Sequence, residues 1–297
     1  MMYRSRLETE KNEKPVDPGR YDKHFFLDSE VGCGCGGWKI IQETGGQQFP
    51  AYYREFYELA QIKAGNRVLD VGCGRGEFVL FCALQGAIAT GVDYSSGAIE
   101  IANGLKELVA KGRGDNSIVQ RSIFQQVDAK ALPFPDGEFD VIVSRAFVEH
   151  LHQWEFLQVL KECKRVLKLN GSLVIATHPN VWYRDYGFPI VYFLKQLLPF
   201  LRRVSGVEAI PYNPHAERES GLHVNEQSIL SLRKTLKKAG FRSKVWLGPR
   251  FAYRQERLAE EFGLPGLLLY LLVRALETWV PFKYIFADEI YAIARKA

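Results

Sequence analysis

The chain has 297 residues, of which 47% are hydrophobic and 25% charged, an ordinary balance for a protein with one large folded core. Its net charge of +5, with acids and bases interspersed, is too small to imply a nucleic-acid partner. Five cysteines without framework spacing argue against a disulfide scaffold and for a reducing, cytoplasmic setting.

The N-terminal part is predicted to be a tail followed by leader helices. Residues 1–20 are charged and hold no apolar stretch, so we expect no signal peptide there. Cys33 and Cys35, in the run Gly-Cys-Gly-Cys-Gly-Gly, resemble half of a metal site. No second cysteine pair or histidine cluster completes it, so we prefer a flexible glycine turn and predict no metal.

A buried strand followed by three alternate glycines is the strongest local pattern. Residues 67–71 predict a parallel strand and residues 75–85 a helix. The glycines between them allow the backbone to approach a ligand without a Cβ in the way. Their spacing is Gly-x-Gly-x-Gly rather than Gly-x-Gly-x-x-Gly, which argues against a nicotinamide or flavin dinucleotide.

A second short strand, predicted at 87–92, leads directly into Asp93. Ligands of open parallel sheets bind at the carboxyl ends of strands, where a carboxylate can accept hydrogen bonds from both ribose hydroxyls. Asp93 could instead cap the helix predicted at 95–110. Because Ser95 or Ser96 can supply that cap, we favour ribose binding.

The remaining elements continue to alternate, which predicts an α/β fold. We expect a turn at 168–171 and a helix at 227–239 that ends at Gly240. Further predicted strands lie at 121–127, 139–144, 171–177, 241–247 and 284–295, with another helix at 153–168.

Four motifs in this order resemble the class I S-adenosylmethionine-dependent methyltransferases, and within them the small-molecule, type 11-like group. The motifs are Val-Leu-Asp-Val-Gly-Cys-Gly-Arg-Gly (68–76), Asp93, Leu-Pro-Phe (132–134) and Glu-His-Leu (149–151). The resemblance implies a Rossmann-like, doubly wound sheet of seven strands, mostly parallel with the last strand antiparallel, with helical cap insertions. It also implies S-adenosyl-L-methionine as the cofactor.

The resemblance assigns ten cofactor-binding residues, all near the carboxyl ends of strands. They are Asp70, Gly72, Cys73, Gly74, Asp93, Tyr94, Asp128, Ala129, Ser144 and Arg145. The first four would hold the methionine end, and the pair after the second strand the ribose and adenine. The pair after the third strand would contact the adenine ring, and the last pair would flank the sulfonium. The run Ser-Arg-Ala-Phe from residue 144 also differs from the Asn-Pro-Pro-Tyr of enzymes that methylate exocyclic amines.

An oxygen acceptor would be helped by a general base, for which His150, His178 and His223 are candidates. His150 belongs to the Glu-His-Leu motif, and His178 follows the fifth predicted strand, where the resembled fold holds its acceptor. We take His150 and His178 as the predicted catalytic residues. Each could instead have a structural role in capping or packing.

Two insertions rich in aromatic and leucine residues interrupt the minimal fold, at 180–222 and 249–283. Neither apolar run reaches the ~18 residues needed to span a bilayer. They could form a cap with its own core, a lid over an apolar acceptor, or a peripheral membrane contact. We therefore divide the chain into a tail and leader (1–60), a cofactor-binding core (61–179), a cap insertion (180–222), core completion (223–248), a second insertion (249–283) and a final strand (284–297).

The predicted function is methylation of a small molecule, with an oxygen acceptor on an apolar, glycosylated or lipid-like compound. A carbon methyltransferase of the sterol or quinone type is the alternative within enzymes. A non-catalytic cofactor-binding scaffold is the alternative outside them. RNA modification is disfavoured because the sequence has no basic arm or added RNA-binding domain.

Overall fold

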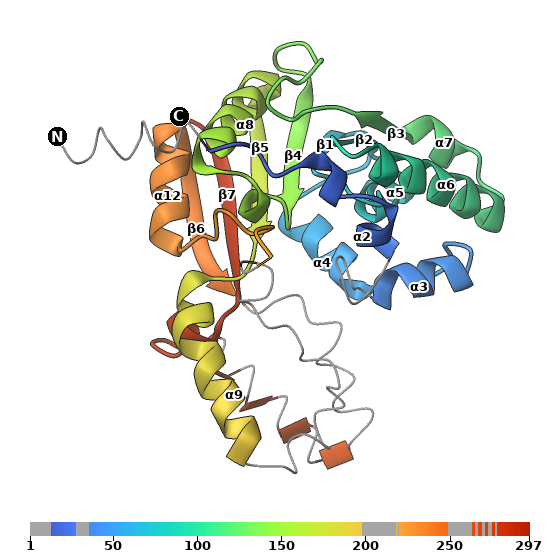
Figure 1. The fold of residues 1–297 in the computed structure, drawn as a ribbon. Helices are drawn as coiled ribbons and strands as arrows, with labels where there is room; N and C mark the ends of the chain where they lie inside the picture. Colours follow the sequence, from blue (N-terminus) through green and yellow to red (C-terminus); the bar gives the residue numbers. More distant parts are fainter. Residues whose placement is uncertain are drawn as a thin grey trace.

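The computed structural model describes residues 13–27, 36–197, 218, 220–248, 263–264, 267–268, 271–272, 275–276 and 278–297. A seven-stranded sheet in the order β3-β2-β1-β4-β5-β7-β6 forms its centre (Figure 1). β1 to β5 pair in parallel, and β7 runs antiparallel to both β5 and β6. The strands are β1 (Arg67–Val71), β2 (Ile88–Asp93), β3 (Ser122–Gln126), β4 (Phe139–Arg145), β5 (Leu167–Thr177), β6 (Phe241–Gly248) and β7 (Glu289–Lys296). The expected doubly wound sheet with an antiparallel last strand is thereby confirmed.

The central strands are apolar on both faces because helices cover both. Leu69 and Ile142 face one core with α8 (Gln153–Val166) and α12 (Ile229–Lys238). Their neighbours in sequence face the other core, which contains residues of several further helices. These helices are α3 (Gly36–Glu43), α4 (Ala51–Leu59), α5 (Glu77–Leu84), α6 (Ser96–Arg113) and α7 (Ser117–Arg121). Strands buried on both sides have no polar face, which explains their continuous apolar runs.

The turn expected at 168–171 is wrong, because β5 already begins at Leu167. Phe139 of β4 pairs with Leu167 and Val141 pairs with Ser172, so β5 carries extra residues at this point. An irregularity of this kind bends a strand without ending it. Turn-forming residues inside a bulge therefore mimic a loop in the sequence.

The last strand also begins later than expected, because residues 283–286 form the short helix α14 (Lys283–Phe286). The Asn180 side chain donates to the carbonyl oxygens of Ala287 (3.0 Å) and Tyr284 (3.4 Å), and the ring of Trp182 lies 5.9 Å from that of Tyr284. Contacts from a segment about a hundred residues away thus hold this helix, which a local pattern cannot indicate.

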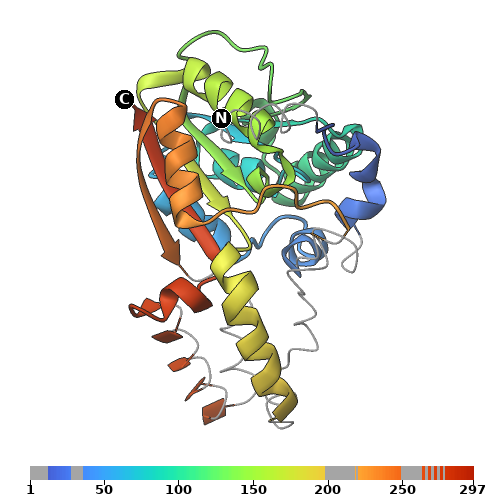
Figure 2. The same cartoon turned by 60° about the vertical axis from the view of Figure 1, so that its left-hand side comes forward.

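The insertions are only partly covered by the described residues. The π-helical turn η3 (Tyr183–Gly187) leads into α9 (Phe188–Leu197), which projects beyond the sheet, away from α8 and α12 (Figure 2). The rest of the first insertion and most of the second, like Cys33 and Cys35, lie outside the described residues. In the described part of the chain, no helix has the length and apolar character required to cross a bilayer. The domain boundaries and the cap stay predictions.

Arg165 of α8 stabilises the turn that follows β3 through several hydrogen bonds. Its guanidinium donates to the carbonyl oxygens of Leu132 (2.8 Å) and Phe134 (2.7 Å) and to the carboxylates of Glu162 and Asp136. Glu162 in turn accepts from the backbone N–H of Leu132 at 2.9 Å. The Arg165 side chain thus supplies the hydrogen bonds to two carbonyl groups of the turn.

We expect Arg165→Ala to lower the free energy of unfolding by about 2–3 kcal/mol, because two carbonyls and two carboxylates lose a charged donor. For a chain of this size that corresponds to a fall in melting temperature of about 3–5 °C. Thermal unfolding followed by circular dichroism measures it. Lys161→Ala, an exposed position on the same helix, is the control and should stay within about 0.5 kcal/mol of the parent. Equal melting temperatures for the two variants would remove the role assigned to Arg165.

Candidate active site

The turn between β1 and α5 has a backbone that requires glycine. Gly72, Gly74 and Gly76 have φ angles of +76°, +50° and +78°, which L side chains rarely adopt. A Cβ on Gly72 would lie 2.4 Å from the ring of Phe147, and one on Gly76 would lie 2.5 Å from the ring of Phe124. The backbone conformation therefore favours glycine at all three positions, and close packing adds a second requirement at Gly72 and Gly76.

Asp93, at the end of β2, holds the glycine turn and the start of α6 together. One of its carboxylate oxygens accepts from the N–H of Gly74 at 3.0 Å, and the other from the N–H of Ser95 at 2.9 Å. The cap of α6 is Ser95, whose Oγ accepts from the N–H of Ala98. The expectation that a serine supplies the cap is thus confirmed. Each carboxylate oxygen keeps capacity for a second hydrogen bond.

Two acids lie close together in this buried region. Burial, together with the charges of Asp93 and Glu77, raises the pKa of Asp70 to about 7, although Arg145 acts in the opposite direction. Burial also raises the pKa of Asp93, while backbone N–H groups of Ser95, Gly74 and Tyr94 oppose the shift. The carboxyl ends of β1 and β2 therefore form an acidic, poorly solvated edge that favours a cationic ligand.

Arg75, which lies between the second and third glycines of the motif, is a residue that the sequence analysis did not identify and that the structure places in a central position. Its guanidinium pairs with Glu77 at 2.8 Å and donates to the carbonyl oxygen of Phe26 at 2.8 Å, and it lies 5.2 Å from the ring of Trp38. Both partners of the ion pair are buried. This arrangement connects the leader to the glycine turn, and no local sequence signal indicates it.

The leader covers the glycine turn. In this segment the 3-10 turn η1 (Pro18–Arg20) precedes α2 (Lys23–Leu27). The Tyr21 carbonyl accepts from the Ser95 hydroxyl at 2.5 Å, and the Tyr21 ring lies 5.6 Å from that of Tyr94. Phe26 is 3.4 Å from the position of a Cβ on Gly74. Aromatic side chains of the leader thus shield this edge from water.

Of the two residues that the sequence places after β3, Ala129 is buried and Asp128 is exposed. The Asp128 carboxylate accepts from the N–H of Lys130 at 2.9 Å, and the Lys130 ammonium lies 3.3 Å away. The N–H of Val127 donates to the carbonyl oxygen of Asp93 at 2.9 Å. That hydrogen bond brings the start of this loop next to the end of β2.

The end of β4 is strained and packs on the glycine turn. Ala146 has φ of +49°, a conformation that costs a non-glycine residue roughly 1–3 kcal/mol and is common at functional sites. Ser144 is buried, and its hydroxyl has no hydrogen-bond partner among the described residues. The Arg145 guanidinium lies 4.7 Å from the ring of Tyr52 and 4.0 Å from a carboxylate oxygen of Glu289.

The three candidate histidines lie together beyond the ends of β4 and β5. His150, in the 3-10 turn η2 (Val148–His150), has its Nδ1 3.0 Å from the Tyr21 hydroxyl. Its ring centroid is 4.8 Å from that of His223, which is 6.4 Å from that of His178. The His178 Nδ1 lies 3.7 Å from a carboxylate oxygen of Glu149, which is fully buried.

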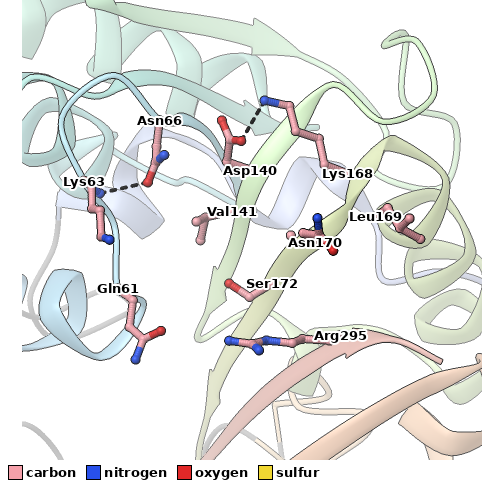
Figure 3. A pocket seen from close by; sticks show the side chains of 11 residues that line it. Gln61, Lys63, Asn66, Asp140, Val141, Lys168, Leu169, Asn170, Ser172 and Arg295 are labelled. Atoms are coloured by element: carbon pink, nitrogen blue, oxygen red, sulfur yellow. Dashed lines mark hydrogen bonds and ion pairs between the residues drawn. The ribbon is translucent and has the colours of Figure 1, made fainter.

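A separate cavity of about 480 Å³ lies at the opposite edge of the sheet (Figure 3). It is formed at the amino ends of β4 and β5, where Lys168 pairs with Asp140 at 2.7 Å, and its lining includes Lys63 and Arg295. None of the ten residues assigned to the cofactor lines it. Ligands of doubly wound sheets bind at carboxyl ends, so this cavity does not belong to the candidate site.

Comparison with known proteins gives one family match. Residues 69–175 match the family described as methyltransferase domain. The chain is 32% identical over 120 residues to 27-O-demethylrifamycin SV methyltransferase of Amycolatopsis mediterranei, covering 40% of each protein. It is 30% identical over 175 residues to a ubiquinone/menaquinone biosynthesis C-methyltransferase of Xylella fastidiosa, covering 56% of this chain and 64% of that one. The chain thus spans less than two thirds of these relatives.

Solved structures of methyltransferases have a similar fold. An S-adenosylmethionine-dependent methyltransferase from Archaeoglobus fulgidus superposes with a TM-score of 0.51 at 20% identity, covering 89% of this chain and 100% of that one. At this identity the likeness shows the fold. The match over residues 69–175, together with the strand order and the glycine turn, shows that this part of the chain is a methyltransferase domain with the fold of the S-adenosylmethionine-dependent methyltransferases.

Proposed function

We propose that this protein transfers a methyl group from S-adenosylmethionine to a hydroxyl oxygen of a small, partly apolar molecule. The observation that carries this proposal is the buried Asp93 carboxylate, held against the left-handed glycine turn by hydrogen bonds from Gly74 and Ser95. Such an edge suits a ligand with ribose hydroxyls at one side and an ammonium and sulfonium at the other.

The residues of this edge fit the cofactor part by part. Asp93 has capacity for hydrogen bonds from two ribose hydroxyls, and Asp70, when ionised, attracts the ammonium of the methionine end. Ala129 and Asp128 follow β3 on the adenine side, beside Tyr94. The remaining assigned residues belong to the glycine turn and to the end of β4, namely Gly72, Cys73, Gly74, Ser144 and Arg145.

The acceptor lies, in this proposal, beyond the ends of β4 and β5. When bound, the cofactor supplies an electrophilic methyl group, so the chain must orient an oxygen toward it and exclude water. His178 accepts the hydroxyl proton, and the Glu149 carboxylate near its Nδ1 stabilises the resulting imidazolium. His150 is the alternative base, with its Nδ1 directed at Tyr21.

The apolar character of the acceptor is supported by exposed aromatic side chains around α9. Tyr186, Tyr192 and Phe193 are 55–61% exposed beyond the end of the sheet. Trp279 and Phe282 are also exposed and precede Lys283, a combination suited to peripheral contact with a membrane surface. The three described cysteines are free, buried thiols, which supports the proposal of a reducing, cytoplasmic setting.

Methylation of carbon is the second candidate function. It is favoured by the similarity to the quinone-pathway C-methyltransferase and by the buried carboxylate of Glu149 beside the histidines. A carbon acceptor needs a group that removes or stabilises charge rather than a strong base, and a carboxylate–imidazole pair provides it. A non-catalytic scaffold has no need for the complete acidic edge.

For the ribose contact, we expect Asp93→Ala to weaken binding of S-adenosylmethionine by about 1.5–3 kcal/mol, or roughly 10- to 150-fold. Isothermal titration calorimetry measures the dissociation constants. Glu107→Ala removes the same charge from an exposed position of α6 and should leave the affinity unchanged. An Asp93→Ala dissociation constant equal to that of the parent would mean that the ribose is bound elsewhere.

The affinity for the cofactor should also depend on pH through Asp70. With a pKa of about 7, the carboxyl is mostly protonated at pH 6 and mostly ionised at pH 7.5. Only the ionised form attracts the ammonium, so affinity should rise about five- to tenfold across this interval. The α-amine of the ligand has a pKa of about 7.7–8.0 and loses its charge above pH 7.5, which sets the upper limit of the interval. The affinity of Asp70→Asn for the cofactor should not change with pH over this interval. An affinity of the parent that is independent of pH would contradict the role of Asp70 in binding the ammonium.

Screening hydroxylated apolar compounds for release of S-adenosylhomocysteine tests the activity itself. On the acceptor found, replacing the true base, by His178→Gln or His150→Gln, should cost at least ~100-fold in turnover while leaving cofactor affinity unchanged. Full turnover in both variants would indicate catalysis by positioning alone and remove both histidines as bases. Methyl transfer to carbon in the product would select the second candidate function.

A further inference from the structure

Three potential metal ligands converge beyond the carboxyl end of β4. One carboxylate oxygen of Glu149 and one ring nitrogen each of His150 and His223 lie within 4.8 Å of one another. Glu149 and His223 are buried, while His150 is half-buried and gives access from outside. The backbone N–H groups of Val224 and Asn225 both donate to the carbonyl oxygen of Glu149, at 2.9 and 3.0 Å. These two hydrogen bonds bring His223 to residues that lie over seventy positions earlier.

Each of the three side chains is also held in place by a further group. Nδ1 of His223 is 3.3 Å from a carboxylate oxygen of Glu226, and Nδ1 of His150 is 3.2 Å from the carbonyl oxygen of Leu222. Metal-binding histidines are oriented in this way, through a carboxylate or carbonyl at the nitrogen that does not bind the metal. A carboxylate oxygen of Glu149 accepts from the Thr177 hydroxyl at 2.8 Å.

The outer partners are themselves fixed. The side chain of Glu226 is 3% exposed and pairs with Arg184, which also pairs with Asp185 at 2.7 Å. The hydroxyl of Tyr21, from the leader, provides a second contact to Nδ1 of His150 at 3.0 Å. A set of ligands supported on several sides keeps its geometry, which is a requirement for selective binding of a metal.

We propose that Glu149, His150 and His223 bind one divalent first-row transition cation, with Zn²⁺ as the best match. Two imidazoles and one carboxylate form the ligand set of open zinc sites, which keep a fourth position for an exogenous oxygen. Mg²⁺ and Ca²⁺ prefer oxygen ligands alone and are disfavoured. Zinc bonds of about 2.0–2.2 Å in a tetrahedral arrangement require donor atoms about 3.3 Å apart, so small side-chain rotations must close the cluster.

The open position would be occupied by the oxygen of the acceptor. A bound cation lowers the pKa of a hydroxyl that it contacts and orients the oxygen. The proton then leaves to His178, whose ring lies 6.4 Å from that of His223 and which stays outside the ligand set. The role of the cation in orienting the acceptor oxygen rests on the proposed function. The binding of the cation is argued only from the positions of the three ligand side chains.

Titration of metal-free full-length protein with Zn²⁺ tests the site, by calorimetry and by elemental analysis after dialysis. We expect one high-affinity ion per chain and a loss of affinity of at least 100-fold in His223→Gln and in Glu149→Gln, since removal of a mere outer partner already costs 10- to 100-fold. His152→Gln, close in sequence to His150 but outside the cluster, and the double variant Cys33→Ser/Cys35→Ser should keep the parent affinity.

Two further measurements separate loss of the site from loss of the fold. Zn²⁺ should raise the melting temperature of the parent but not of His223→Gln. S-adenosylmethionine should bind metal-free parent and His223→Gln with equal affinity. A parent that takes up no Zn²⁺, or a His223→Gln variant that retains it with the parent affinity, would overturn the metal site. Zinc binding without any binding of S-adenosylmethionine would overturn the proposed function instead and leave the metal site standing.

Discussion

The structure of the candidate site depends on one buried carboxylate. Asp93 accepts from the N–H of Gly74 and of Ser95, and its carbonyl oxygen accepts from the N–H of Val127. One residue thereby joins the loops that follow β1, β2 and β3. A carboxylate buried in this way is stable only because backbone donors satisfy it. These donors leave each oxygen with capacity for one more hydrogen bond, so the group that stabilises the turns can also accept a ligand hydroxyl, as the proposed function requires.

Burial of the carboxyl ends of β1 and β2 makes ionisation of the carboxyl groups there less favourable. The leader, tied to the glycine turn by Arg75, excludes water from the ends of β1 and β2. Burial removes the water that would stabilise an ionised carboxylate, and the neighbouring charges of Asp93 and Glu77 add repulsion, so the pKa of Asp70 rises to about 7. A positively charged ligand would relieve this repulsion.

The sequence was sufficient where structure is determined by neighbours along the chain. The strand at 67–71, the glycine turn and the capping serine at 95 follow from local patterns, and the structure confirms them. It was insufficient where contacts between segments far apart in the chain determine the local structure. The bulge in β5 follows from its pairing with β4, and α14 is held by Asn180 from about a hundred residues away. The burial of Arg75 and the meeting of His223 with His150 are likewise products of tertiary packing. The roles assigned to the site residues and the domain boundaries stay predictions.

The two halves of the site differ in how they are built. The cofactor half consists of backbone turns at the ends of adjacent strands, all inside the matched residues 69–175. The acceptor half is assembled from η2, the residue after β5 and the segment before α12, and both His178 and His223 lie beyond that match. In the proposed function the matched part therefore carries the cofactor chemistry and one acceptor-side turn, η2, whereas His178 and His223 come from outside it. Under the proposed function, this division directs the search for the acceptor to the histidine cluster, whose members His178 and His223 lie outside the matched residues.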